Sequence, residues 1–229
     1  MELMKISCFM RKTSLLMKYF KEYFLFDLSI SKQNKIKRGI NKIFKLVLTK
    51  KEIKEFNKGL SAIKNKLSND ALCAYKYDPS FNSLEEAILS SPGLFAIMVY
   101  RVSNYLSDMN IKIIPRLLSE YAHSKTGIDI HPEATIGNNF FIDHGTGIVI
   151  GATTIIGDNV KIYHGVTLGA RSINELSDRK MKRHPTINCG VTIYSNSTIL
   201  GGDTVIGEYS IIGAHKLIKE SIPSNTTVI

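Results

Sequence analysis

The sequence has no tryptophan and only three cysteines, Cys8, Cys73 and Cys189, which lie far apart. An odd number of scattered cysteines gives no disulfide framework and none of the paired spacing of a cysteine metal site. The cysteines fit a reducing compartment. We interpret Cys189, which lies beside a predicted turn, as a small apolar residue.

A long apolar run is also missing from the 229 residues. Residues 14–30 are rich in Leu, Phe and Tyr, but Lys18, Lys21, Glu22 and Asp27 interrupt them. No uncharged run approaches the ~20 residues of a membrane-spanning helix, and no apolar core precedes a small-residue cleavage site. We therefore expect no membrane span, no secretory signal and a cytoplasmic protein. For this segment we prefer a packing or oligomer-contact helix to the alternative, an amphipathic surface helix.

Acidic residues are scarce, since 20 Asp and Glu stand against 30 Lys and Arg for a formal net charge of +10. Residues 1–70 hold 17 basic and 6 acidic residues, so the whole excess lies there. A basic segment suits nucleic acid or an acidic membrane. Because the cations are mostly Lys and no nucleic-acid-binding motif accompanies them, we expect a solvated helical face and no nucleic-acid partner.

A six-residue repeat of large aliphatic side chains dominates residues 128–218, and Gly often follows the aliphatic residue, as at Ile150-Gly151. A period of six fits neither an α-helix nor an alternating strand. It is typical of a β-helix, in which three short strands form each coil of about eighteen residues and the aliphatic side chains point inward. The repeating positions are Ile130, Ile136, Ile142, Ile148, Ile150, Ile156, Ile162, Leu168, Ile187, Ile193, Ile199, Leu200, Ile206, Ile212 and Ile218.

Helical signals fill the chain before this repeat. Ser83 and Glu86 form a capping box, and Pro115 suits the first turn of a last short helix. We therefore expect two domains: a basic, helical N-terminal lobe over residues 1–125 and a β-helix over residues 126–229.

The repeat stops once, between Leu168 and Ile187, where residues 170–186 form a polar, charged insertion. Solenoids accept insertions at their corners, and such loops often carry function. A solvated surface loop is the alternative. His184 beside Arg183 makes this loop a candidate functional site.

Histidine spacing gives a second candidate. His144 follows Asp129 by nearly one predicted coil, and Asp143 adjoins His144. A carboxylate that orients an imidazole makes a general base. His164 follows His144 by slightly more than one coil, and a shift in the phase of the repeat at Ile150 predicts that it lies on the same side of the next coil. Three histidines could instead bind zinc, as in trimeric β-helix hydrases of the γ-carbonic-anhydrase kind. The sequence contains six histidines that could contribute: His123, His131, His144, His164, His184 and His215.

Several segments are more distinctive than the bare repeat. They are Tyr-Asp-Pro-Ser at 77–80, Pro-Gly-Leu-Phe-Ala-Ile-Met-Val-Tyr-Arg at 92–101, Ile-Asp-His-Gly-Thr-Gly-Ile-Val-Ile-Gly at 142–151, Gly-Val-Thr-Leu-Gly at 165–169 and Arg-His-Pro at 183–185. Together they resemble the serine O-acetyltransferases, a family of hexapeptide-repeat acyltransferases, over about residues 70–223.

The resemblance implies a left-handed parallel β-helix and transfer of acetyl from acetyl-CoA to the hydroxyl of L-serine, in cysteine biosynthesis. It implies that His144 is the general base and that Asp129 pairs with it and holds its tautomer. The serine oxygen would attack the thioester directly in a ternary complex. The implied serine-binding residues are Asp78 and Asp143 for the ammonium group and Arg183 and His184 for the carboxylate.

The resemblance also implies partners. The acetyl-CoA arm would lie near Gly169, Ala170, Gly213 and Ala214, and no metal is expected. Family members form trimers through the coils and hexamers through the helical lobe. They can dock O-acetylserine sulfhydrylase through a C-terminal isoleucine, here Ile229.

This chain departs from the family in three places. It has Ala152 within Gly151-Ala152-Thr153, where the family commonly has Gly-Glu-Thr, and Ala-His-Lys at 214–216, where small residues are usual. Its loop at 170–186 is also longer and more charged. Other interpretations are a hexapeptide acyltransferase for another acceptor, such as a sugar or a different amine, a zinc hydrase, and a non-catalytic scaffold.

Overall fold

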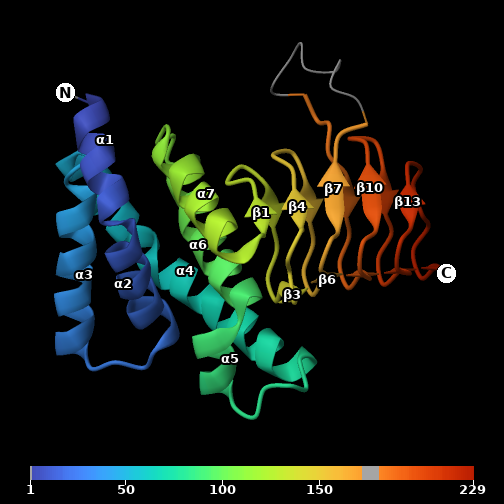
Figure 1. Ribbon diagram of the computed structural model, residues 1–229, viewed down its shortest axis with the longest axis horizontal. Helices are drawn as coiled ribbons and strands as arrows, with labels where there is room; N and C mark the ends of the chain where they lie inside the picture. The colour runs from blue at the N-terminus through green and yellow to red at the C-terminus, as the bar shows by residue number, and fades with distance from the viewer. Residues whose placement is uncertain (1, 172–180) are drawn as a thin grey trace.

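The computed structural model describes residues 2–171 and 181–229; residues 172–180, within the predicted insertion, lie outside the described residues. A helical lobe occupies one end of the molecule, and a parallel β-solenoid extends from it toward the C-terminus (Figure 1). This arrangement confirms the predicted fold class. The helices are α1 (Glu2–Arg11), α2 (Thr13–Leu25), α3 (Ile30–Phe44), α4 (Lys50–Tyr77), α5 (Leu84–Ser90), α6 (Pro92–Asp108) and α7 (Ile114–Thr126).

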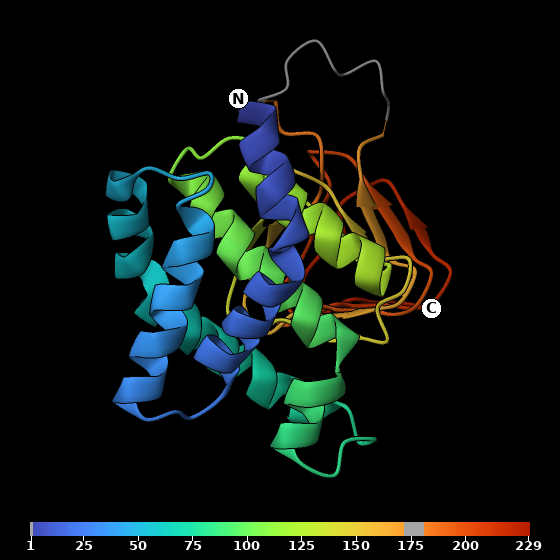
Figure 2. The ribbon, with the colours of Figure 1, turned by 60° about the vertical axis from the view of Figure 1, so that its left-hand side comes forward.

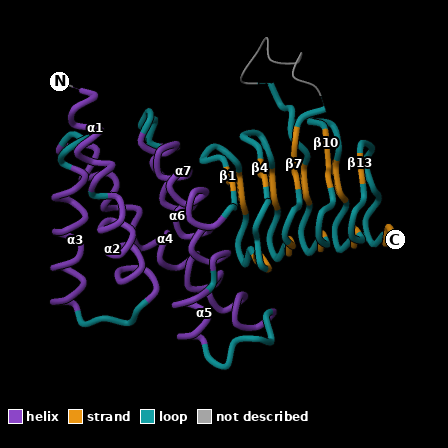
Figure 3. Tube along the Cα trace, viewed as in Figure 1, coloured by secondary structure: helices purple, strands orange, loops and turns teal. Residues whose placement is uncertain are grey.

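Short strands follow the last helix. They are β1 (Asp129–Ile130), β2 (Thr135–Ile136), β3 (Phe141–Asp143), β4 (Val149–Ile150), β5 (Ile155–Ile156), β6 (Lys161–Tyr163), β7 (Thr167–Gly169), β8 (Thr186–Ile187), β9 (Thr192–Ile193), β10 (Thr198–Leu200), β11 (Val205–Ile206), β12 (Ile211–Ile212), β13 (Leu217–Ile218) and β14 (Thr227–Val228). They form three parallel sheets, which are the faces of the solenoid (Figure 3). Sheet A contains β1, β4, β7, β10 and β13; sheet B contains β2, β5, β8 and β11; sheet C contains β3, β6, β9, β12 and β14.

Neighbouring coils pair in a register that keeps the aliphatic repeat inside. Asp129 lies opposite Val149, and Val149 lies opposite Thr167, so the first coil is slightly longer than the second. Ile150 and Leu168 pair in the same register and are 1% and 0% exposed. Burial of these aliphatic columns stabilises each coil against its neighbours, because a single coil has no core of its own.

The corners between the sheets carry most of the predicted site residues. The C–A corner, which joins sheet C to sheet A, comprises residues 144–148, 164–166, 194–197 and 213–216. The A–B corner, which joins sheet A to sheet B, comprises residues 131–134, 151–154, 170–171 with 181–185, and 201–204. Residues at equivalent positions of successive coils therefore stack along one edge of the solenoid.

The helical lobe has a large apolar core. Within α2, four side chains from the Leu- and Phe-rich segment are buried in it: Leu16, Met17, Phe20 and Phe24. Helices α6 and α7 lie between α1–α3 and the solenoid (Figures 1 and 2). Among the described residues, no helix is both long enough and apolar enough to cross a membrane.

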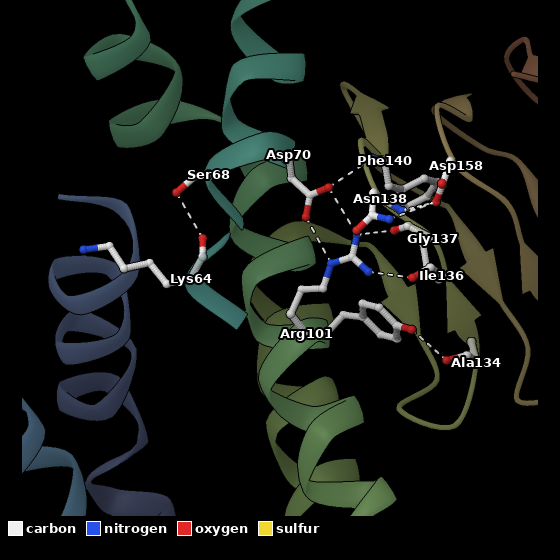
Figure 4. Close-up of polar contacts among 11 residues, drawn as sticks. Lys64, Ser68, Asp70, Arg101, Ala134, Ile136, Gly137, Asn138, Phe140 and Asp158 are labelled. Atoms are coloured by element: carbon white, nitrogen blue, oxygen red, sulfur yellow. Dashed lines mark hydrogen bonds and ion pairs between the residues drawn. The ribbon is translucent and has the colours of Figure 1, made fainter. Parts of the chain in front are cut away.

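A buried ion pair joins the lobe to the first coil (Figure 4). Arg101 of α6 donates through Nε and Nη2 to the carboxylate of Asp70 in α4, at 3.0 and 3.1 Å. Its Nη1 and Nη2 also donate to the carbonyls of Ile136 and Gly137, both at 2.6 Å, and the N–H of Phe140 donates to Asp70 at 3.0 Å. Burial raises the pKa of the Asp70 carboxyl, and Arg101 opposes that rise. The ion pair thus provides hydrogen-bond partners for backbone groups of the first coil that are buried by contact with the lobe.

The same helices hold strand β3 in place. The ring of Tyr77, the last residue of α4, contacts the ring of Phe141 with centroids 5.8 Å apart. Gly93, near the start of α6, allows close approach, since a Cβ there would lie 2.5 Å from the carbonyl oxygen of Ile142. Because β3 leads directly into His144, these contacts set where the candidate base lies relative to α4.

Candidate active site

His144 opens the C–A corner and is accessible to solvent. Its side chain is 73% exposed, and its φ of +55° lies in the left-handed region, which histidine enters more readily than most residues. Its Nε2 is 3.7 Å from a carboxylate oxygen of Asp143, and its ring centroid is 5.6 Å from that of His164. The structure therefore brings together an exposed imidazole, a carboxylate and the histidine that the spacing placed one coil beyond.

Asp129 lies in sheet A, paired with the strand that follows the corner of His144. Its Oδ1 is 3.7 Å from Nη1 of Arg116 in α7 and is buried, with no hydrogen bond to any described residue. No hydrogen bond joins Asp129 to His144 in the described part of the chain. One full circuit of the first coil leads from Asp129 to Val149, so His144 falls short of the position that stacks on Asp129. His144 consequently lies at the corner, whereas Asp129 lies in sheet A.

An acidic and aromatic patch surrounds Asp143. Tyr163 lies opposite Asp143 in the register of sheet C and stacks on Tyr194 of the next coil, with centroids 4.9 Å apart. Burial raises the pKa of the Tyr163 hydroxyl, and the neighbouring Asp143, Tyr194 and Asp78 raise it further. Asp78, which directly follows α4, is thereby placed on the same patch. Its Oδ1 accepts hydrogen bonds from the backbone N–H and the hydroxyl of Ser80, at 2.9 and 2.6 Å.

Sequence reasoning did not single out Tyr163 or Tyr194. Only the pairing of successive coils shows that they stack beside Asp143. The sequence did contain one signal. Each tyrosine directly follows an inward Ile of the repeat, Ile162 or Ile193, so its side chain is expected to point outward.

His184 and Arg183 lie at the A–B corner, on the coil that carries the insertion. His184 is 8% exposed, and its Nδ1 lies 3.1 Å from the backbone N of Thr153 and 2.9 Å from its Oγ1. Burial lowers the pKa of His184 to about 4, and the nearby cations Arg183 and Lys182 lower it further, as does His131. His184 is therefore neutral near pH 7.

Lys182 ties this part of the loop to the corner below it. Its ammonium donates to the carbonyls of Thr153 and Pro185, at 2.8 and 3.1 Å, and also to that of His184. Burial lowers the pKa of the Lys182 ammonium. These contacts fix the backbone of the Arg183-His184 pair against the preceding coil.

The predicted residues therefore fall into two groups at opposite edges of sheet A. Asp143 and His144 lie at the C–A edge with Gly213 and Ala214, and Arg183 and His184 lie at the A–B edge with Gly169 and Ala170. About four extended residues, roughly 13 Å of strand, separate the two edges. One amino acid is shorter than that, so a single chain does not bring the two groups onto one small substrate.

The described residues contain one group of candidate metal ligands within 4.8 Å of one another, Glu120, His123 and Asp129. The guanidinium of Arg116 contacts both carboxylates of this group. A cation thus already lies against both carboxylates, and the group contains one histidine rather than three.

Comparison with known proteins identifies the family. No protein-family model matches the chain. A plasmid-borne serine acetyltransferase of Synechococcus elongatus is 42% identical over 146 residues, which are 62% of this chain and 46% of that protein. The serine acetyltransferase of Staphylococcus epidermidis is 39% identical over 164 residues, which are 72% of this chain and 74% of that protein. The chain belongs to the serine acetyltransferase family.

Solved structures of the family share the fold. Serine acetyltransferase isoform 3 of Entamoeba histolytica, in complex with cysteine, superposes with a TM-score of 0.84 at 33% identity, over 93% of this chain and 80% of that one. The enzyme of Neisseria gonorrhoeae in complex with serine gives 0.73 at 27% identity, over 94% and 80%. The match with the first curated relative spans about half of that protein's length. Membership of this family favours the acyltransferase interpretation over the zinc hydrase and the scaffold.

Proposed function

We propose that the protein transfers acetyl from acetyl-CoA to the hydroxyl of L-serine, giving O-acetyl-L-serine and CoA for cysteine biosynthesis. The observation that carries the proposal is the exposed imidazole of His144 beside Asp143, in a chain of the serine acetyltransferase family. The three free cysteines and the two metabolite substrates support a cytoplasmic location.

His144 is the proposed general base. A serine hydroxyl is a poor nucleophile until a positioned base takes its proton, and such a base contributes roughly 10²- to 10⁴-fold to the rate. The serine oxygen then attacks the thioester carbonyl, the carbon–sulfur bond breaks, and the departing sulfur takes the proton from His144, so that CoA leaves as the thiol. Asp129 is the proposed partner of His144, because its Oδ1 is a buried acceptor without a hydrogen-bond donor among the described residues and an imidazole N–H would supply one.

Two charged groups are proposed to hold the amino-acid backbone of serine. Asp78 and Asp143 belong to one acidic patch, which suits the ammonium group. Arg183 supplies the cationic grip on the carboxylate, since its planar guanidinium can bind a carboxylate through two hydrogen bonds. His184, neutral near pH 7, adds a hydrogen-bond donor. The ring of Tyr163 lines the part of the proposed site that binds the ammonium group.

We propose that the complete site forms between two chains of a trimer. Because the two groups lie at opposite edges of sheet A, the C–A corner of one chain must meet the A–B corner of the next. A closed three-fold ring repeats this head-to-tail contact three times, so every site receives both groups. The helical lobe, away from these corners, remains for pairing of two trimers into a hexamer.

The acetyl-CoA arm is proposed to follow the same boundary. Gly213 and Ala214 of one chain and Gly169 and Ala170 of its neighbour would line it, where small residues leave backbone groups accessible to the arm. The chain's own His215 and Lys216 flank the first pair and add polar groups that most family members lack at these positions.

An acceptor screen tests the proposal. Release of CoA from acetyl-CoA is followed with L-serine, with other amino acids, with amines and with sugars. L-serine is expected to give the highest kcat/KM, and a matched chain with His144→Ala the lowest turnover. Faster turnover with a sugar or a simple amine would show that the protein is an acyltransferase for another acceptor.

O-acetylserine sulfhydrylase is the proposed protein partner, with Ile229 as the contact. Ile229 is 93% exposed, whereas strand β14 just before it is paired with β12. A ten-residue peptide ending in Ile229 is titrated into the sulfhydrylase of the same organism, beside the same peptide without Ile229. Tighter binding of the first is expected, and indistinguishable binding of the two would remove this contact.

A further inference from the structure

His184 packs against the segment Gly151-Ala152-Thr153, none of whose residues has yet been given a role in the site. We infer that Thr153 is a positioning residue, which holds His184 in the neutral tautomer that presents Nε2–H as the donor to a carboxylate. Gly151 provides the space in which the ring lies. The role in carboxylate binding rests on the proposed function, whereas the tautomer itself does not.

The hydrogen bonds at Nδ1 decide the tautomer. The backbone N–H of Thr153 lies 3.1 Å from Nδ1 of His184, and a backbone N–H can only donate. Nδ1 must therefore carry the lone pair, and the single proton of the neutral ring must be on Nε2. The ring nitrogen that remains as a donor is thus fixed by a residue 31 positions earlier in the chain.

The hydroxyl of Thr153 uses its full hydrogen-bonding capacity on the same loop. Its Oγ1 accepts from the backbone N–H of Arg183 at 2.9 Å and of His184 at 3.0 Å. Its own proton then shares the lone pair of His184 Nδ1, 2.9 Å away, with the backbone N–H of Thr153. A hydroxyl has one donor and two acceptor positions, so these three contacts satisfy all of them. One side chain anchors both the backbone and the ring.

Gly151 makes room for the ring. A Cβ at this position would lie 2.1 Å from Cδ2 and 2.2 Å from Nε2 of His184, closer than any real contact. Its backbone is not in the left-handed region, so alanine there is compatible with the backbone and would act through the ring alone. The ring consequently lies directly over Gly151, with its Nε2 edge at that residue.

The charges that face His184 favour the same neutral state. They are Arg183 and Lys182 on its own loop and His131 on the preceding part of the A–B corner. With burial, they lower its pKa to about 4, so the imidazole stays neutral as pH falls from 8 to about 5. A neutral ring with one fixed N–H is selective for an acceptor group such as a carboxylate oxygen.

Nuclear magnetic resonance of the full chain labelled with ¹⁵N-histidine tests the tautomer without any substrate. The His184 signals are identified by their loss in His184→Gln. The parent protein and Thr153→Ser are expected to show protonated Nε2 and unprotonated Nδ1 between pH 6 and 8. Thr153→Val keeps the backbone N–H but removes the hydroxyl that holds the N–H groups of Arg183 and His184. The ring is therefore expected to shift off that backbone N–H, which gives a mixture of tautomers and a titration midpoint that moves up toward the ordinary histidine range.

The chain offers a matched control in Thr154. Its hydroxyl is buried and has no hydrogen-bond partner in the described part of the chain, so Thr154→Val makes the same chemical change one residue away. It should leave the His184 signals unchanged. If Thr153→Val also leaves them unchanged, or if the parent ring is protonated on Nδ1, the inference is overturned.

If Thr153→Val does not fold, Gly151→Ala tests the packing of the His184 ring while it keeps Thr153. It is expected to displace the ring and change the His184 signals, and unchanged signals would contradict the inference. In the acetyl-transfer assay, Thr153→Val should raise KM for L-serine about tenfold while KM for acetyl-CoA stays within twofold, as expected for loss of one binding hydrogen bond. If Thr153→Val changes the His184 signals as expected but changes the KM for no acceptor, the result would instead count against the proposed function.

Discussion

At the scale of single residues, position at the corner explains the properties of His144. It follows strand β3 directly, and its left-handed φ of +55° turns the chain out of sheet C. The turn leaves the side chain 73% exposed, so the imidazole can reach a substrate. His164, at the equivalent place one coil later, has a buried Nδ1 without a hydrogen bond to any described residue, and its ring contacts that of His144.

His144→Ala is expected to reduce kcat by at least ~100-fold, because the serine hydroxyl then loses its general base. Binding of acetyl-CoA, measured by calorimetry, should change little, since the imidazole acts on the acceptor. His164→Ala serves as the comparison and should have the smaller effect on kcat. Turnover of His144→Ala within a few-fold of the parent enzyme would show that another group takes the proton.

At the scale of elements, two helices of the lobe decide where the first coil lies. Helix α4 carries Asp70, which holds the backbone of Phe140, and then Tyr77, which contacts Phe141. Helix α6 carries Arg101, which binds two carbonyls of the same turn. The lobe is thus bonded to the strand that precedes His144.

Asp70→Asn should destabilise the protein by roughly 3 kcal/mol or more, because it leaves the buried guanidinium of Arg101 without its counter-charge. Urea denaturation at one fixed protein concentration measures the change. Glu55→Gln is the matched control in the same helix, since its ion pair with Lys58 is exposed and such pairs contribute little. Equal denaturation midpoints for the two variants would show that the buried pair does not hold the lobe to the coil.

At the scale of the whole molecule, the solenoid holds apart two groups of proposed site residues that must both contact one serine molecule. The candidate base and the acidic patch lie at one edge of sheet A, and the carboxylate-binding pair lies at the other. In the proposed trimer, a second chain supplies the missing half at each edge. Catalysis and assembly are therefore coupled in the proposed enzyme.

Mixed assemblies test this coupling. Chains with His144→Ala are co-expressed with chains carrying Arg183→Ala, and the activity of the mixture is measured at low serine. If each site takes His144 from one chain and Arg183 from the next, about one quarter of the sites in randomly mixed trimers contain both intact residues. Activity well above the average of the two pure variants is expected. No gain on mixing would place the whole site within one chain.

The sequence by itself determined the architecture, because each of its signals is local. A six-residue repeat of aliphatics predicts inward columns whatever the rest of the chain does, and capping residues mark helices within one turn. Asp143 beside His144 and Arg183 beside His184 are neighbours through covalent bonds. The resemblance then named the family that the comparisons confirm.

Only the tertiary structure decided which residues meet between coils and between domains. The first coil is slightly longer than the next, so Asp129 pairs with Val149, whereas His144 lies at the corner after β3. Thr153 reaches His184 across 31 residues, and Asp70 reaches Phe140 across 70. Such contacts depend on register and on the packing of the lobe, which a periodic pattern does not encode because every coil has the same pattern.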